Sequence, residues 1–205
     1  MDWKITHWLN GSLRHHTMPQ HLVTWLVQAS VPVVAALTIT LWFCSRPGDR
    51  TYKRASATAL AASAIALGIN QIITHIWQRA RPFTAHPHQV ILLASRSHDP
   101  SFPSDHAAAS FAIAASVLLY SRRAGLGFVL LAIIVSMSRV MAGVHYPSDV
   151  VAGAIIGTAA AMGVRYLIPG PLDWLVSLAS KATDPVVAPA WNWVDSRRRR
   201  ERRPN

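Results

Sequence analysis

Residues 101–120, SFPSDHAAASFAIAASVLLY, place three polar side chains directly before a run of apolar residues. Ser104, Asp105 and His106 open this run, which carries no further charge until Arg122. Ser or Asp before an apolar run usually caps a helix, because its side-chain oxygen accepts a hydrogen bond from a free backbone N–H group. The stretch therefore predicts a helix that begins at a polar cluster and continues into a hydrophobic environment.

Four further apolar runs are long enough to cross roughly 30 Å of hydrocarbon at about 1.5 Å per helical residue. Of the 205 residues, 51% are hydrophobic and only 14% are charged, which a soluble domain of ordinary composition does not match. We expect an all-α integral-membrane bundle of about five transmembrane helices, with the shorter run Pro103 to Tyr120 as the third. The other runs are Leu22 to Cys44, Ala55 to Trp77, Leu126 to Ala142 and Val150 to Ile168.

The two ends of the chain differ from these runs. Residues 1–20 mix Trp3, Trp8 and aliphatic residues with polar groups, which predicts a short interfacial helix. Residues 169–205 predict an amphipathic and basic cytoplasmic tail, because a sixth span would carry the arginine-rich end outside. This division leaves residues 21–168 as the transmembrane domain.

The formal net charge of +11 does not indicate a nucleic-acid partner, because the basic residues lie in connections rather than on one groove-reading face. They follow the first, third and fifth spans, and Lys and Arg favour the cytoplasmic side. We therefore expect the N-terminus outside, with the loop 78–102 and the turn 143–147 facing the exterior or the periplasm.

On this topology, polar residues from four segments converge at the outer face of the membrane. They come from the end of the second span, the start of the third, the end of the fourth and the start of the fifth. Polar groups at this depth are costly, so four coincidences indicate a site. The residues are Arg81, Ser104, Asp105, His106, Arg139, His145 and Asp149.

The residue types indicate phosphoryl transfer. Arg81 and Arg139 suit phosphate oxygens, and a helix start adds free N–H groups and a positive dipole end. Asp149 follows His145 by four residues, so its carboxylate can hold one ring nitrogen as N–H and leave the other free to attack phosphorus. His106 is placed to protonate the leaving oxygen. Each feature alone is more often structural; together they predict hydrolysis through a phosphohistidine.

Three blocks of the chain resemble the signature of the type 2 phosphatidic acid phosphatase superfamily. They are Arg81-Pro82, Pro103-Ser104-Asp105-His106, and Ser138-Arg139 followed by His145 and Asp149. The wider text, ITHIWQRARPF, SFPSDHAAA and SRVMAGVHYPSDVVAG, is similar to the bacitracin-resistance type of bacterial undecaprenyl-diphosphatases.

The resemblance implies that His145 attacks the terminal phosphoryl group, that Asp149 orients it and that His106 protonates the leaving group. The phosphate ligands that it implies are Arg81, Ser104 and Arg139, with no metal and no other cofactor. The expected activity converts undecaprenyl diphosphate to undecaprenyl phosphate and inorganic phosphate in the bacterial inner membrane, which recycles the carrier lipid for envelope synthesis. The expected partners are this polyprenyl diphosphate and membrane lipids; the sequence does not indicate an oligomeric state.

Two alternatives remain open. Phosphatidylglycerol phosphate, phosphatidic acid or another prenyl diphosphate is an alternative substrate, because a phosphate clamp does not identify the lipid tail. A non-enzymatic lipid transporter is a second alternative, although the spans lack the paired broken helices in repeated halves that are typical of transporters. The loop from Ala85 to Pro100 is long and irregular, which is typical of a lid, and it can equally be passive.

Two positions depart from the superfamily pattern. Thr74 stands where a Lys is usual, and we consider Arg79 or His75 as the replacement for its charge. Asp105 stands where Gly is more common, and we expect a carboxylate there to raise the pKa of His106, unless it only caps the helix.

Overall fold

The computed structural model describes residues 1–201, and within that range the chain is a bundle of eight helices. Four of them, α2, α3, α6 and α7, are long and apolar enough to cross a membrane, and α5 is a shorter apolar helix. The expected all-α membrane bundle is therefore confirmed. The helices are α1 (Asp2–Gly11), α2 (Thr17–Phe43), α3 (Thr51–Ile76), α4 (Pro82–Ala85), α5 (Asp105–Tyr120), α6 (Arg122–Met141), α7 (Pro147–Leu167) and α8 (Pro169–Glu201).

Most of the long helices begin several residues before the apolar runs that predicted them. α2 begins at Thr17 rather than Leu22, and α6 begins at Arg122 rather than Leu126. Apolar composition marks only the part of a helix that matches hydrocarbon, whereas the backbone hydrogen bonds continue into the polar interface. The helix expected within residues 1–20 ends at Gly11.

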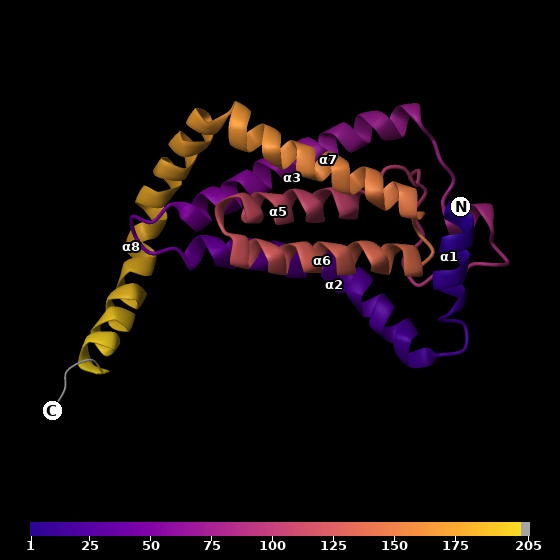
Figure 1. Cartoon of the computed structure of the whole chain (residues 1–205), viewed down its shortest axis with the longest axis horizontal. Helices are drawn as coiled ribbons and strands as arrows, with labels where there is room; N and C mark the ends of the chain where they lie inside the picture. Colours follow the sequence, from indigo (N-terminus) through magenta and orange to yellow (C-terminus); the bar gives the residue numbers. More distant parts are fainter. Residues whose placement is uncertain (202–205) are drawn as a thin grey trace.

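The central helix is α5, which packs against α3, α6 and α7 (Figure 1). Its contact with α7 depends on two glycines of α7: a Cβ at Gly153 would collide with the carbonyl oxygen of Ser104, and one at Gly157 with that of Ala108. This close approach brings the start of α5 beside the start of α7, where the Ser104 N–H donates to the Asp149 carbonyl oxygen at 3.0 Å.

The helix α8 crosses the end of the bundle opposite α1 (Figure 1). It is continuous through Pro185 and Pro189 and is not one of the candidate spans. Its cytoplasmic location stays a prediction, and Arg202 and Arg203 of the predicted tail lie outside the described residues. Three ion pairs join α8 to the start of α3 and to the connection between α2 and α3: Lys53 with Asp184, Arg54 with Asp173, and Arg46 with Asp195.

Candidate active site

His145 lies in the turn 142–146 between α6 and α7. Gly143 allows the turn, because its φ of +74° is a conformation that L residues with side chains rarely adopt. The His145 Nδ1 lies 2.8 Å from the carbonyl oxygen of Ser101. A carbonyl only accepts hydrogen bonds, so Nδ1 carries the proton and Nε2 of the neutral ring keeps its lone pair. That Nε2 lies 3.4 Å from Nη1 of Arg81, so a phosphate bound by Arg81 is within reach of it.

Asp149 is buried in the first turn of α7 and holds His145 less directly than its spacing suggests. Its Oδ2 lies 3.7 Å from the His145 Nδ1, which is too long for a hydrogen bond. The same Oδ2 accepts the Tyr146 N–H at 2.7 Å and the Ser101 hydroxyl. Ser101 therefore stands between the two residues, with its hydroxyl on the carboxylate and its carbonyl on the imidazole.

A polar cavity of about 270 Å³ opens beside His145. Its wall contains Arg139, which is 8% exposed and whose Nε is buried with no hydrogen-bond partner among residues 1–201. A buried guanidinium N–H without an acceptor is costly, so this donor calls for an anionic ligand. The sequence-predicted residues that line the cavity are Thr74, Arg81, Asp105, His106, Arg139 and His145.

The start of α5 forms the opposite wall. Ser104 is its N-cap, with a hydroxyl that accepts from the Ala107 N–H at 3.5 Å, and it is fully buried rather than on the cavity wall. Asp105 accepts a hydrogen bond from Nδ2 of Asn70 on α3 at 2.8 Å. His106 follows it and faces the cavity. The first N–H groups of α5 have no acceptor from a preceding turn of the helix.

The two residues considered as replacements for the missing lysine both lie away from this cavity. His75 is exposed, and its Nδ1 contacts the carbonyl oxygen of Gln71 in its own helix. Arg79 lies behind Asp149, to which its Nη1 donates at 2.7 Å. Thr74 does line the cavity, with a hydroxyl 3.5 Å from the Phe102 carbonyl oxygen. The position of the usual lysine thus offers a neutral hydroxyl.

The loop that follows α4 closes one side of the cavity through Ser95, Ser97 and Asp99. Arg81 is tied to this loop, because its Nε donates to the Asp99 carbonyl oxygen at 2.8 Å. The Leu93 N–H donates to the Ala142 carbonyl oxygen at 3.2 Å, which joins the loop to the turn before His145. Whether the loop moves as a lid stays a prediction.

The electrostatics favour a neutral imidazole at His145. Burial lowers the pKa of His145 from its ordinary value, Arg81 and Arg139 lower it further, and Asp149 acts in the opposite direction. A neutral ring is the form that can attack phosphorus. Among residues 1–201, the His, Cys, Asp and Glu side chains form no group of three that is arranged to hold a metal ion.

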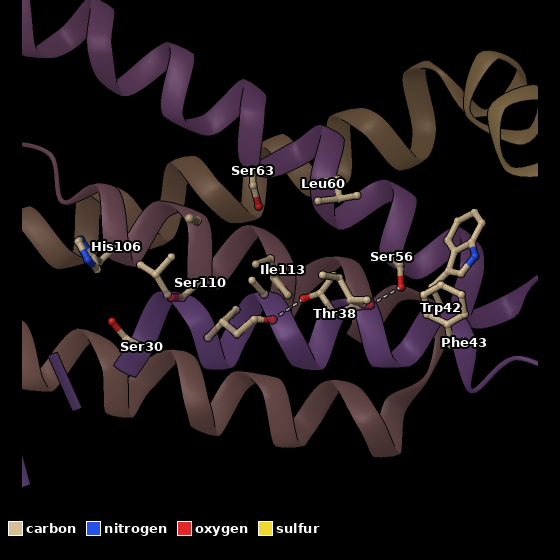
Figure 2. Close-up of a pocket in the computed structure, with 15 residues that line it drawn as sticks. Ser30, Thr38, Trp42, Phe43, Ser56, Leu60, Ser63, His106, Ser110 and Ile113 are labelled. Atoms are coloured by element: carbon tan, nitrogen blue, oxygen red, sulfur yellow. Dashed lines mark hydrogen bonds between the residues drawn. The ribbon is translucent and has the colours of Figure 1, made fainter. Parts of the chain in front are cut away.

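A second cavity, about 350 Å³, runs between α2, α3 and α5 and is almost entirely apolar (Figure 2). His106 stands at one end of it, and Trp42 and Phe43 stand at the other (Figure 2). His106 lines both cavities, so the apolar cavity begins at a residue that also borders the polar one.

Three residues of the site were not predicted from the sequence. Ser101 and Asn70 are buried serine and asparagine residues with no distinctive spacing, and Asp2 reaches the site from the far end of the chain. For Ser101 a signal existed, since it lies only three residues before the N-cap Ser104 in SFPSDH. Ser101 contacts His145 through its backbone carbonyl oxygen, and a backbone contact cannot be predicted from the pattern of side chains.

A membrane helix bundle with two histidines, two arginines and a buried carboxylate at one end has the parts of an integral-membrane phosphatase. The chain belongs to the PAP2 superfamily, whose family profile matches residues 55–171. It is 27% identical to undecaprenyl-diphosphatase BcrC of Bacillus subtilis, over 76% of this chain and 78% of that protein. It is 34% identical to the decaprenylphosphoryl-5-phosphoribose phosphatase of Mycobacterium tuberculosis, over 67% of this chain and 68% of that one.

The fold is also similar to that of a solved structure. The crystal structure of Aquifex aeolicus LpxE superposes with a TM-score of 0.67 at 23% sequence identity, covering 80% of this chain and 95% of that one. The family and the fold that the sequence predicted are thus confirmed.

Proposed function

We propose that this chain removes the terminal phosphate of undecaprenyl diphosphate through a phosphohistidine at His145. The observation that carries the proposal is the pairing of two groups in one cavity. The unprotonated Nε2 of His145 keeps its lone pair, 3.4 Å from Nη1 of Arg81, and the buried Nε of Arg139 is a donor with no acceptor among residues 1–201. The phosphorus of a terminal phosphate is the electrophile that Nε2 of His145 attacks. One of the phosphate oxygens accepts the hydrogen bond from Nε of Arg139.

In the first step, Nε2 of His145 attacks the terminal phosphorus, the N–P bond forms and the bond from phosphorus to the bridging oxygen breaks. His106 gives a proton to that oxygen, so that undecaprenyl phosphate leaves. In the second step, a water molecule gives a proton back to His106 and attacks the phosphohistidine. This attack releases inorganic phosphate and restores the neutral imidazole.

Arg81 and Arg139 neutralise the phosphate oxygens, and the start of α5, capped by Ser104, adds its backbone N–H groups. Asp149 holds His145 through Ser101 and stabilises the positive charge that develops on the ring during attack. Thr74 offers a hydroxyl rather than a charge, so the site binds the diphosphate with two arginines.

The substrate class rests on the apolar cavity between α2, α3 and α5. A diphosphate seated beside His145 has its tail directed past His106, and the cavity begins there. The wall is apolar along its length to Trp42 and Phe43, which suits an uncharged hydrocarbon chain. The named activities of the relatives, a diphosphatase of undecaprenol and a decaprenyl-linked phosphatase, also favour a polyprenyl tail.

The proposed orientation places the cavity outside. Figure 1 shows α1 at one end of the bundle and α8, with the connection between α2 and α3, at the other. The cavity is at the α1 end, because Asn10 of α1 donates to Met141 directly before the turn that carries His145. The basic residues Arg46, Arg50 and Arg197 to Arg200 are at the other end, in α8 and that connection. Because basic residues favour the cytoplasmic side, the cavity faces the periplasm or the exterior, where a diphosphate remains after glycan transfer. The proposed location is the bacterial inner membrane.

A broader lipid phosphatase is the second candidate, favoured by a similarity of 32% identity to a lipid A 1-phosphatase of Rhizobium johnstonii. The test measures phosphate release by the purified full-length protein from undecaprenyl diphosphate, phosphatidylglycerol phosphate and phosphatidic acid, with and without chelator. We expect the highest kcat/KM with undecaprenyl diphosphate, no effect of chelator, and complete loss in His145→Ala.

A matched control is Arg198→Ala in α8, which lies far from the cavity and is expected to keep full activity. A preference for phosphatidic acid would favour the broader phosphatase. No phosphate release from any of the three lipids would favour a transporter and contradict the proposal.

A further inference from the structure

Figure 1 shows α1 at the end of the bundle where α6 ends and α7 begins. One buried side chain fixes it there, next to the turn whose His145 lines the polar cavity. Asn10 donates from Nδ2 to the carbonyl oxygens of Ile91 and Met141, each at 2.8 Å, and its Oδ1 accepts the Ile91 N–H at 2.8 Å. Ile91 belongs to the loop that closes the cavity, and Met141 ends α6 directly before the turn that carries His145. The contacts of α1 are therefore made with the segments that form the site.

The first residue of α1 makes a second set of contacts. Asp2 accepts the backbone N–H of Ser148 at 3.1 Å through Oδ1, and its Oδ2 accepts the Ser148 hydroxyl and Nη2 of Arg79, the latter at 2.9 Å. Partial burial opposes ionisation of Asp2, but these hydrogen bonds outweigh it and hold its pKa below the ordinary value. Ser148 is in the first turn of α7, where a negative charge also suits the positive end of the helix dipole.

Arg79 is held between two carboxylates. Its Nη1 donates to Oδ1 of Asp149 at 2.7 Å and to the Ser148 hydroxyl at 2.7 Å, while its Nη2 donates to Asp2. The guanidinium lies over the Tyr146 ring, 4.0 Å from the centroid. A planar guanidinium that is hydrogen-bonded through both Nη1 and Nη2 is held in one orientation. A guanidinium that is bound through one nitrogen alone can rotate about the bonds of its long side chain. Asp2 therefore determines whether Arg79 presents one fixed donor to Asp149.

From these contacts we propose that Asp2 of α1 is a positioning residue for catalysis, which acts on Asp149 through Arg79 and Ser148. The chain of contacts runs from Asp2 to Arg79, from Arg79 to Oδ1 of Asp149, and from Oδ2 of Asp149 through Ser101 to the nucleophile. Without Asp2, the carboxylate loses its fixed donor, so the imidazole is presented to phosphorus less accurately. The inference rests on the proposed function, because it assigns α1 a part in the same reaction.

The test compares Asp2→Asn with the wild type, as full-length protein with a purification tag at the C-terminus. The neutral amide keeps the size of the side chain but loses the charge that holds Arg79. We expect kcat for undecaprenyl diphosphate to fall about tenfold with KM within about twofold, since misplacement of a reacting group affects the transition state more than binding. Asp2→Glu restores the charge and is expected to recover most of kcat.

The matched control is Asp49→Asn at the opposite end of the bundle, where Asp49 also accepts a backbone N–H, that of Thr51 at 2.9 Å. This variant is expected to keep the wild-type kcat. A second readout is the double variant Asp2→Asn with Arg79→Gln, which should be no less active than Arg79→Gln alone, because both changes interrupt one path.

Several outcomes would overturn the inference. An unchanged kcat in Asp2→Asn, multiplicative losses in the double variant, or a kcat in Asp2→Glu as low as in Asp2→Asn would each show that Asp2 does not act through Arg79. These results leave the proposed function standing as long as the wild type releases phosphate. A wild type that releases none contradicts the proposed function itself.

Discussion

The close contact between α5 and α7 gives the sharpest stability prediction. In Gly157→Ala the new methyl group collides with the carbonyl oxygen of Ala108, and the next nearest atom is the backbone nitrogen of Ala112, at 2.8 Å. Backbone atoms cannot turn aside as a flexible side chain can, so the helices must separate. Overpacking costs about 3 kcal/mol at the upper end of its usual range, and the better helix propensity of Ala returns about 1 kcal/mol. The expected net loss is about 2 kcal/mol.

The measurement is the apparent Tm of the purified protein in detergent, compared with Gly163→Ala. Gly163 lies in the same helix, and apart from the backbone of its own helix no atom of residues 1–201 comes within 4 Å of the added methyl group, so this control gains only the helix propensity. We expect Gly157→Ala to lower the Tm by about 4–8 °C and Gly163→Ala to leave it unchanged or to raise it slightly. Equal Tm values for the two variants would show that α5 and α7 are not in close contact, and would remove the basis for placing His106 opposite His145.

Three further predictions concern the chemistry. Arg139→Ala should reduce kcat/KM for undecaprenyl diphosphate by about 10²–10³-fold, while Arg123→Ala at the other end of α6 keeps it; a small effect at Arg139 would remove it as a phosphate ligand. Because the pKa of His145 is lowered, its neutral form should persist as the pH falls, so the acid limb of kcat/KM should lie below about 6.5; a limb above that value would contradict a buried, arginine-flanked nucleophile. Ser110→Leu should narrow the apolar cavity one helical turn beyond His106 and raise KM for undecaprenyl diphosphate several-fold, with a smaller effect on a five-carbon prenyl diphosphate; equal effects on both would argue against a tail in this cavity.

The five apolar helices were predictable because the favourable free energy of transferring apolar side chains into hydrocarbon is large and adds up over many residues. Their ends were not, since a start at Thr17 or Arg122 depends on backbone hydrogen bonds in the interface rather than on apolarity. The continuous α8 was not predicted either, because its ion pairs with α3 and with the connection before α3, such as Arg54 with Asp173, come from residues more than a hundred positions away.

The composition of the polar cavity was predictable to the extent that residue type determines chemistry. Arg81, His106, Arg139 and His145 meet in one cavity because each stands at the end of a span on the same side of the bundle. The link between Asp149 and His145 was expected as a direct hydrogen bond from the four-residue spacing. The structure instead inserts Ser101 between them, and a contact through a backbone carbonyl has no sequence signature.

The role of Arg79 illustrates a different limit. Its positive charge made Arg79 a candidate to replace the usual lysine. The guanidinium instead points away from the cavity, because Nη1 binds Oδ1 of Asp149 at 2.7 Å and Nη2 binds Oδ2 of Asp2 at 2.9 Å. Asp2 precedes Arg79 by 77 positions, so only the docking of α1 brings the two together. Asp105 lines the cavity and accepts a hydrogen bond from Asn70. Its effect on the pKa of His106 stays a prediction.

The central claim is that His145 carries the phosphoryl group during turnover. Undecaprenyl diphosphate labelled with ³²P in the terminal phosphate is mixed with the purified protein, quenched in alkali to preserve phosphohistidine, and the labelled peptide is identified. Label on the peptide that contains His145, absent in His145→Ala, is the expected result. Rapid phosphate release with no protein-bound label, or label on another residue, would contradict it.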